Sequence, residues 1–396
     1  MDTIVDVDLG DPDLYATLGR HTRWREFAVA DEIVWSGPGS SPAGFWSVFS
    51  HRACAEVLAP SAPFTSEYGM MIGFDREHPD TSGGRMMVVA ERDPHRALRR
   101  IVGPLLSRAS ARAMAARVRA EVHEVLDRVL DEPVCDVADA IGPRIPAAVV
   151  CDILGVPAAD QDMLIGLTNH AFGGADELFE GMTPRQAHTE ILVYFDELIT
   201  TRRGRPGADL ISRLVADDGL TTEDVLLNCD NVLIGGNETT RHAITGAVHA
   251  LANVPGLLAR LRDGSADVDV VVEEVLRWTS PAMHVLRVST EPVVLCGRDL
   301  AAGTPVVVWL PAANRDPAEF ADPDTFDPAR SPNRHVAFGH GVHHCLGSAL
   351  ARVELSIVLR ELATRVSHVE LVREPDWLRA IVVRGYRSLP VRFVGR

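Results

Sequence analysis

The segment most able to do chemistry runs from Phe338 to Gly347 and reads FGHGVHHCLG. It ends where an apolar helical pattern, SALARVELSIVLREL, begins, so Cys345 stands at an expected helix N-terminus. Unpaired N–H groups and the positive end of the helix dipole lower the pKa of a thiol placed there. Gly339, Gly341 and Gly347 permit positive φ and let the backbone approach a flat ligand closely. These features favour a thiolate at Cys345.

On the residues alone, three interpretations of this cysteine stay open. Cys345 could be a structural cysteine, because free cysteine is among the most often buried residue types. It could form a zinc site with His340, His343 and His344, although three contiguous residues cannot all point at one tetrahedral ion and no second cluster supplies further ligands. A thiolate ligand to haem iron agrees better with the glycines.

The pattern Phe338-x-x-Gly341-x-x-x-Cys345-x-Gly347 is similar in full to the cysteine-loop signature of the cytochrome P-450 superfamily. The length of the chain and its lack of a membrane anchor resemble the soluble bacterial-type haem-thiolate monooxygenases. The resemblance implies a mainly α fold with small β-sheets, in a single domain over residues 1–396. It implies haem b (iron protoporphyrin IX) between the long central helix and the cysteine-loop helix, with Cys345 as the axial iron ligand and Phe338 in the cofactor site.

The six residues GGNETT, which begin at Gly235, place two glycines and an acid/alcohol pair inside an otherwise apolar helical run. This could be a close helix crossing in which a threonine bonds back to its own backbone. The segment also resembles the family element that lies over the distal face of haem. That resemblance implies that Thr239 holds dioxygen and water, that Glu238 helps to supply protons, and that Gly235 and Gly236 leave room. Asn237 is the variable position and is expected to contact substrate.

A second pattern, Glu274-Val-Leu-Arg277, puts an acid and a base on one helix face, where they can form an ion pair. Such pairs are common on helix surfaces and alone carry little information. This pair lies in an apolar context about seventy residues before the cysteine, as the buried Glu/Arg pair of the family does. The resemblance adds Arg330 as a third partner and implies a structural role for all three.

Haem would bring two propionates, which need cationic or hydrogen-bonding partners when they are buried. His95 and Arg99, four apart on an expected helix, resemble the propionate-binding helix of the family, although Asp93-Pro94 stands where the family often has Pro-Pro. Arg287 and His343 match the other usual partners. A solvated surface charge is the alternative for any one of these residues.

The substrate pocket is expected to draw on three segments. The residues between the first strands and His95 supply adaptable apolar side chains, the segment from Asn169 to Met182 is expected to form a lid, and the segment from Ala282 to Leu286 is expected to form a wall beside the haem. These choices predict a mainly apolar ligand. The proposed pocket residues are Met70, Met71, Ile72, Asn237, Met283 and Val285.

The elements that must position these residues are mostly helical. Apolar residues recur at helical spacing from Pro94 to about Asp131, and a long helix is predicted from about Thr222 to Asn253, with a capping box at Thr221 and Asp224. The long helix is apolar nearly all round, so it should be buried. Short strands are expected at 26–50 and after Pro292, with a final helix from about Cys345 to Val366.

Composition excludes several classes of protein. The 396 residues carry a net charge of -16, which argues against nucleic acid and anionic membranes as partners. Six scattered cysteines without CxxC pairs disfavour a disulfide framework or zinc ribbon. No apolar stretch reaches about 18 residues, and the first residues are acidic, with no basic region followed by an apolar run. We expect a cytoplasmic protein.

The predicted function is a monooxygenase that hydroxylates or epoxidises a mainly apolar organic substrate with dioxygen. The variant GGNETTRHA resembles bacterial members that tailor antibiotics, which predicts a macrolide or polyketide intermediate as substrate, or alternatively an amino acid tethered to a carrier protein. Electrons would come from a ferredoxin and its ferredoxin reductase, because no redox segment is fused to the chain. Docking is expected at Arg108, Arg112 or Arg352.

Other functions stay open. A peroxide-using hydroxylase or a dehydratase of the same fold commonly lacks the threonine that stands here at Thr239. A haem-based binding or sensing protein would be favoured by a fused output domain, and a metal-free helical scaffold would show no haem absorption band.

Overall fold

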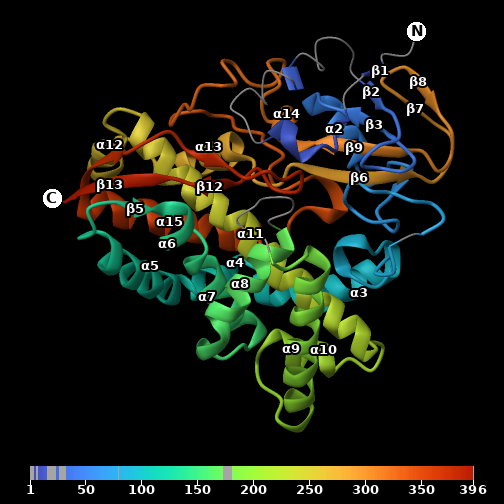
Figure 1. Cartoon of the computed structure of the whole chain (residues 1–396), viewed down its shortest axis with the longest axis horizontal. Coiled ribbons are helices and arrows are strands. Elements are labelled where there is room, and N and C mark those ends of the chain that lie inside the picture. The colour runs from blue at the N-terminus through green and yellow to red at the C-terminus, as the bar shows by residue number, and fades with distance from the viewer. Residues whose placement is uncertain are drawn as a thin grey trace.

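The computed structural model describes residues 4–5, 8–15, 24–25, 33–78, 80–172 and 181–395. Most of the helices lie together, and the largest sheet lies to one side of them (Figure 1). The predicted fold class, mainly α with small sheets, is confirmed. Residues 26–32 of the expected first strands and 173–180 of the expected lid lie outside the described residues. Within the described ranges, no helix is both long enough and apolar enough to cross a membrane.

The described helices follow the apolar periodicities of the sequence. They are α2 (His51–Val57), α3 (Arg92–Val102), α4 (Arg108–Ala113), α5 (Ala115–Val129), α6 (Val137–Ala140), α7 (Arg144–Leu154), α8 (Gln161–Phe172), α9 (Pro184–Gly204), α10 (Leu210–Val215), α11 (Thr222–Asn253), α12 (Leu257–Asp263), α13 (Val268–Thr279), α14 (Leu310–Ala313) and α15 (Ser348–Arg365).

The strands form one larger sheet and three small ones. The larger sheet has the order β1-β2-β3-β9-β6-β4, and the small ones are β10-β13-β5, β11-β12 and β7-β8. The strands are β1 (Ile4–Val5), β2 (Ile33–Ser36), β3 (Phe45–Val48), β4 (Phe64–Thr65), β5 (Cys135–Asp136), β6 (His284–Ser289), β7 (Val293–Leu295), β8 (Arg298–Leu300), β9 (Pro305–Trp309), β10 (Val366–Leu371), β11 (Asp376–Trp377), β12 (Tyr386–Ser388) and β13 (Pro390–Gly395).

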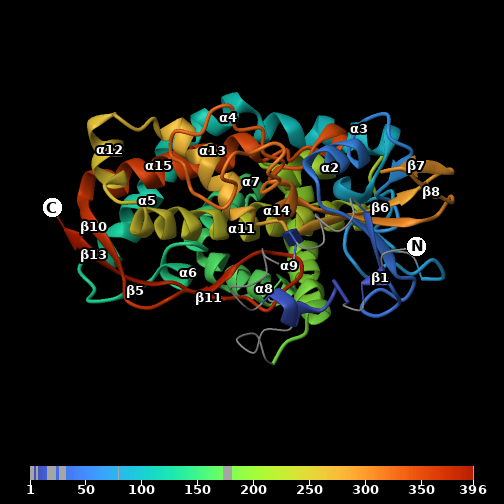
Figure 2. The ribbon, with the colours of Figure 1, turned by 90° about the horizontal axis from the view of Figure 1, so that it is seen from above.

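Helix α11 runs through the middle of the molecule, with α13 and α15 on one side and α6 and α8 on the other (Figure 2). Its N-terminus is closed by the predicted capping box, in which the Thr221 hydroxyl accepts from the Asp224 N–H and the Asp224 carboxylate accepts from the Thr221 N–H. Most of its length is buried, as its apolar sequence predicts. The long helix therefore forms the central support of the fold.

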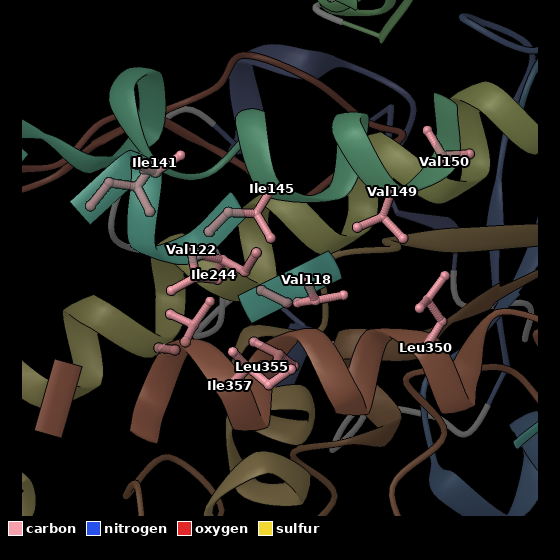
Figure 3. Packing of buried hydrophobic residues seen from close by; sticks show 14 of the residues in the cluster. Val118, Val122, Ile141, Ile145, Val149, Val150, Ile244, Leu350, Leu355 and Ile357 are labelled. Carbon is pink, nitrogen blue, oxygen red and sulfur yellow. The ribbon is translucent and has the colours of Figure 1, made fainter. Parts of the chain in front are cut away.

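The largest core cluster lies where α5, α7, α11 and α15 meet. Figure 3 shows Val118 and Val122 of α5 and Ile145 of α7 facing Ile244 of α11, with Leu355 of α15 below them. All five are fully buried. Burial of a side chain of this size stabilises a fold by about 1.5–3 kcal/mol. The cluster fixes α15, and hence the start of the segment that follows Cys345, against α11.

Two predicted boundaries need correction. The final helix begins at Ser348, three residues after Cys345, because the chain between them forms a turn with Gly347 as the N-cap. The helical region after Pro94 is broken by a 3-10 turn, Gly103–Leu106, where Pro104 cannot donate a backbone hydrogen bond.

Candidate active site

The cysteine loop presents its thiol to a cavity. The Cys345 N–H donates to the Phe338 carbonyl at 2.9 Å, which closes the loop on itself. Gly341 has a φ of +72° and comes so close to Leu58 that an added Cβ would lie 2.1 Å from that residue's carbonyl oxygen. Only glycine fits this position. Gly347, by contrast, has a φ of -77° and does not use the positive φ that glycine permits.

The thiol of Cys345 does not ionise easily in this protein environment. Burial of the sulfur raises the pKa, and this effect outweighs the backbone N–H of Gly347 and the charges of Arg99 and Arg352, which lower it. The N–H of Ser348, the first residue of α15, lowers the pKa of the thiol as predicted, but in the protein alone the burial of the sulfur outweighs this effect. A bound metal cation would have to favour the thiolate.

Arg352 supports the loop from the helix that follows it. Its guanidinium donates to both carboxylate oxygens of Glu273, at 2.6 and 2.8 Å, and lies 4.7 Å from the centre of the Phe338 ring. His335, before the loop, contacts the same carboxylate at 3.1 Å. These partners hold the pKa of Glu273 at about 2, although its burial opposes this. Arg352, expected to dock a ferredoxin, thus has its charge engaged inside the molecule.

The predicted Glu274 ion-pair network is formed. Arg277 donates to both oxygens of Glu274 at 2.7 Å, and both side chains are fully buried. Arg330 donates to the same carboxylate at 3.1 and 3.2 Å, and Asn333 donates at 3.0 Å. Because removing one partner of a buried pair leaves an uncompensated charge, this network fixes the approach to the cysteine loop.

Four groups able to carry positive charge line one part of the same cavity: His95 and Arg99 of α3, Arg287 of β6 and His343 of the loop. The rings of His95 and His343 lie 4.4 Å apart between centroids. Burial, with the nearby charges of His343 and Arg99, lowers the pKa of His95 to about 4, and burial lowers that of Arg287 to about 10. Glu91 lies 3.2 Å from His343 and supplies one negative charge to this group, and an anionic ligand would supply more.

Helix α11 lines the same cavity as Cys345 with residues that include Gly235, Gly236, Thr239 and Thr240. A Cβ on Gly235 would have no atom within 4 Å, so this glycine opens space as expected. A Cβ on Gly236 would lie 2.8 Å from a methyl of Val150, so this glycine also permits close packing of α7. The Thr239 hydroxyl donates to the Gly235 carbonyl at 3.3 Å, in the back-bonded form considered from the sequence.

Glu238 and Asn237 lie on another face of α11. Glu238 is buried, 3.5 Å from Arg241, and burial raises its pKa. The Asn237 amide donates to the Thr168 hydroxyl of α8 at 2.8 Å, and this side chain is also buried. Asn237, which is expected from the sequence to contact substrate, does not line this cavity, because two steps of about 100° carry it away from the face of Gly235 and Thr239.

Comparison with known proteins identifies the family. The family model for cytochrome P450 matches residues 183–376. Cytochrome P450 NovI of Streptomyces niveus is 35% identical over 395 residues, which covers 98% of this chain and 97% of NovI. The chain belongs to the cytochrome P450 family.

Two solved P450 structures are informative. The structure of P450 OxyD, involved in the biosynthesis of vancomycin-type antibiotics, is 79% identical, with a TM-score of 0.95 and coverage of 98% of this chain and 100% of that one. The structure of P450BioI in complex with an acyl carrier protein ligated to hexadec-9Z-enoic acid is 29% identical, with a TM-score of 0.84 and coverage of 94% and 98%. This P450 is a haem-thiolate monooxygenase with relatives in antibiotic biosynthesis.

The described residues fit haem. One cavity is lined by Cys345, by two glycines of α11, and by potential cations that include His95, Arg99, Arg287 and His343. A flat iron porphyrin with two carboxylates matches this set, because the thiolate suits iron and the cations suit the carboxylates. Phe338 also lines the cavity, as expected for a residue of the cofactor site.

The substrate side of the cavity only partly follows the sequence prediction. Met70 and Val285 line it, but Met71, Ile72 and Met283 do not. Met283 is 1% exposed and belongs to a separate core cluster, against which Ile72 packs. The segment of Met70 to Ile72 is a bend between Gly69 and Gly73, which both have positive φ, so its three neighbouring side chains do not share one face. Met87 and Val88 line the cavity and belong to the segment before His95 that was expected to do so. Residues that line it and were not predicted include Val150, Ile153, Asn231 and Ala243.

Proposed function

We propose that this P450 hydroxylates an amino acid tethered to a carrier protein, in the biosynthesis of a peptide antibiotic. The observation that carries the proposal is the 79% identity, over nearly the whole chain, to a P450 of vancomycin-type antibiotic biosynthesis. Vancomycin-type antibiotics are peptides, so their building blocks are amino acids. The P450BioI complex supports a carrier-bound substrate in this fold. A macrolide or polyketide substrate, the first choice from the sequence, has less support.

The proposed cofactor is haem b. We propose that residues 1–396 form the single domain that binds it. Cys345 would ligate the iron, and His95, Arg99, Arg287 and His343 would hold the propionates. When bound, haem supplies the redox chemistry that activates dioxygen and inserts one oxygen atom into the substrate. The protein keeps bulk water from the reacting carbon with apolar side chains from several elements, which include Met87, Val150, Ile153 and Val285.

Thr239 is the proposed catalytic alcohol. It lines the cavity, and its bond of 3.3 Å to the Gly235 carbonyl is long, so the hydroxyl can exchange that bond for one to water or dioxygen. Glu238 is the proposed proton reserve. It lies outside the cavity lining, and burial raises its pKa, which makes a proton available nearer to neutral pH. Arg241, which contacts Glu238, in turn donates to Asn169 of α8.

Electrons are proposed to come from a ferredoxin and its reductase. Arg108 and Arg112 are exposed on α4, which packs against α15 behind the cysteine loop. An acidic partner would be steered to these charges. We expect the double variant Arg108→Glu/Arg112→Glu to be reduced by ferredoxin about tenfold more slowly at low ionic strength. Arg360→Glu, on the exposed far part of α15, serves as the control. If ferredoxin reduces the double variant at the same rate as the parent enzyme, α4 is not the docking surface.

The test of the substrate class is a titration followed by the haem absorption spectrum. An aminoacyl carrier protein, the free amino acid, and a macrolide or polyketide aglycone are added separately. A shift to high spin with the aminoacyl carrier protein, followed by a product that carries one added oxygen, supports the proposal. A shift with the aglycone alone would replace it with the macrolide function, and a preparation that binds no haem would overturn the assignment of Cys345.

A further inference from the structure

Asn231 is a polar side chain in an otherwise apolar part of the cavity. It lies on α11 and is half-buried. The same cavity is lined by apolar side chains of three elements: the 3-10 turn Met87–Val89 and α7, which both contact α11, and α11 itself. These apolar side chains are Met87, Val88, Val150, Ile153 and Val232. The other polar side chains of α11 that line the cavity, Thr239 and Thr240, lie two turns further along.

The amide of Asn231 differs from those of the other asparagines on α11. Asn228 donates to Arg85 and Asp224 carbonyls, Asn237 donates to Thr168, and Asn253 donates to the His249 carbonyl. Within the described residues, the Asn231 side chain has no hydrogen-bond partner in the protein. An amide that lines a cavity with both a free donor and a free acceptor is suited to bind a ligand group.

The register of α11 gives the position of this amide relative to the reaction. Asn231, Gly235, Thr239 and Ala243 follow at intervals of four, and all four line the cavity. At 1.5 Å per residue, Asn231 stands about 12 Å along the helix from Thr239. One residue of an extended chain spans at most about 3.6 Å, which is much shorter than the distance from Thr239 to Asn231. When an amino acid is oxidised near Thr239, the group that contacts Asn231 is therefore farther away than the length of that amino acid's backbone.

We propose that Asn231 is a specificity-determining residue that hydrogen-bonds the first amide of the pantetheine arm carrying the substrate. The inference rests on the proposed carrier-tethered amino acid. An amide of the arm offers one N–H and one C=O, which complement the C=O and NH₂ of asparagine. A thioester carbonyl or an alkyl chain offers no such pair. The contact would recognise the tether rather than the amino acid, and so separates carrier-bound from free substrate.

The test compares two short thioesters of the same amino acid, one with N-acetylcysteamine, which carries the amide, and one with butanethiol, which lacks it. Dissociation constants come from the spin-state shift of the holoenzyme. The parent enzyme should prefer the amide-bearing thioester by about tenfold, the worth of one or two neutral hydrogen bonds. In Asn231→Leu, which keeps the volume and removes the amide, the two thioesters should bind alike. Asn231→Ser, which perturbs packing differently, should lose the preference too.

Three further results would overturn the inference, and they differ in what they say about the proposed function. If Asn231→Leu keeps the preference for the amide, Asn231 does not bind the pantetheine arm, although the proposal of a carrier-tethered substrate is unaffected. If the parent enzyme binds neither thioester nor the aminoacyl carrier protein, both proposals fail. Tyrosyl and phenylalanyl thioesters provide the last comparison: a tyrosyl preference that disappears in Asn231→Leu would mean that Asn231 recognises the amino acid side chain, and would overturn the assignment to the arm.

Discussion

At the scale of single residues, the chain's chemistry depends on side chains whose surroundings work against their charged forms. The pKa of the Cys345 thiol is raised and the pKa values of His95 and Arg287 are lowered, because the protein atoms packed around each group disfavour its charged form. A ligand that brings a metal cation to the sulfur and carboxylates to the cations reverses all three penalties together. The protein is thus prepared for one composite ligand rather than for separate ions.

The two glycines of left-handed conformation in the cysteine loop should respond differently to alanine. Gly341→Ala adds a clash with the Leu58 carbonyl to its strained φ, so we expect it to cost roughly 2–5 kcal/mol and to lower haem occupancy. Gly339→Ala, with a φ of +69° and open space around the Cβ, should cost about 1–2 kcal/mol. Denaturant unfolding and the haem content of the purified proteins measure both. Equal effects would show that the contact with Leu58 is unimportant.

Glu354 of α15 makes the stability of the protein depend on pH. It is buried, and burial raises its pKa from 4.5 to about 8. The folded protein therefore holds the proton more tightly than the unfolded chain. The contribution to stability is present in full below about pH 4.5 and is lost as the pH rises through 8. Glu354→Gln should reduce this loss, as followed by thermal unfolding from pH 5 to 9. An unchanged pH dependence in the variant would contradict the assignment.

At the scale of elements, α11 could be predicted from the sequence with both of its ends, because a capping box opens it, a proline follows it, and apolar residues recur on both sides of the GGNETT segment. What each residue faces was predicted less well. Asn237 was predicted to contact substrate because its position is the variable one in the segment. A spacing of four residues from Gly235 and Thr239 would instead have predicted Asn231 and Ala243 as cavity residues. The delayed start of α15 could not be read from the pattern, since the turn after Cys345 depends on contacts with the rest of the fold.

Adjacent glycines of α11 should have opposite effects when changed to alanine. Gly235→Ala fills open space and removes a flexible residue from a helix, so it should stabilise the protein by about 1 kcal/mol while narrowing the cavity. Gly236→Ala meets the branched side chain of Val150 and should be destabilising by about 1–2 kcal/mol. Unfolding free energies and spin-shift titrations distinguish them. Stabilisation by both changes would mean that α7 moves enough to relieve the contact between Val150 and the added Cβ at position 236.

At the scale of the whole molecule, the cavity gathers residues from Leu58 to Glu354. Motifs with a strict local pattern, such as the cysteine loop and the Glu274 pair, could be found in the sequence. The pocket wall could not, because its side chains come from loops and helices whose facing depends on tertiary packing. Met283 shows the limit: it neighbours the wall residues Ala282 and Val285, yet it belongs to another core cluster.

The shared core should make α15 a determinant of global stability. Leu355 is fully buried between α15 and its neighbours, so Leu355→Ala should destabilise the protein by about 2–5 kcal/mol. Val193 on α9 is 53% exposed, and Val193→Ala should change stability by no more than about 0.5 kcal/mol. Denaturant midpoints with unchanged slopes test both expectations. A small effect of Leu355→Ala would mean that the core around Leu355 does not determine the global stability of the protein.

Successive carboxylates of α13 hold both flanks of the cysteine loop. Glu274 binds Arg330 and Asn333 before it, and Glu273 binds His335 before it and Arg352 after it. None of these bonds involves the cofactor. The loop would then keep its shape before haem arrives, and uptake of haem by the apoprotein would be a bimolecular encounter whose rate rises with haem concentration, without a slow folding step to limit it.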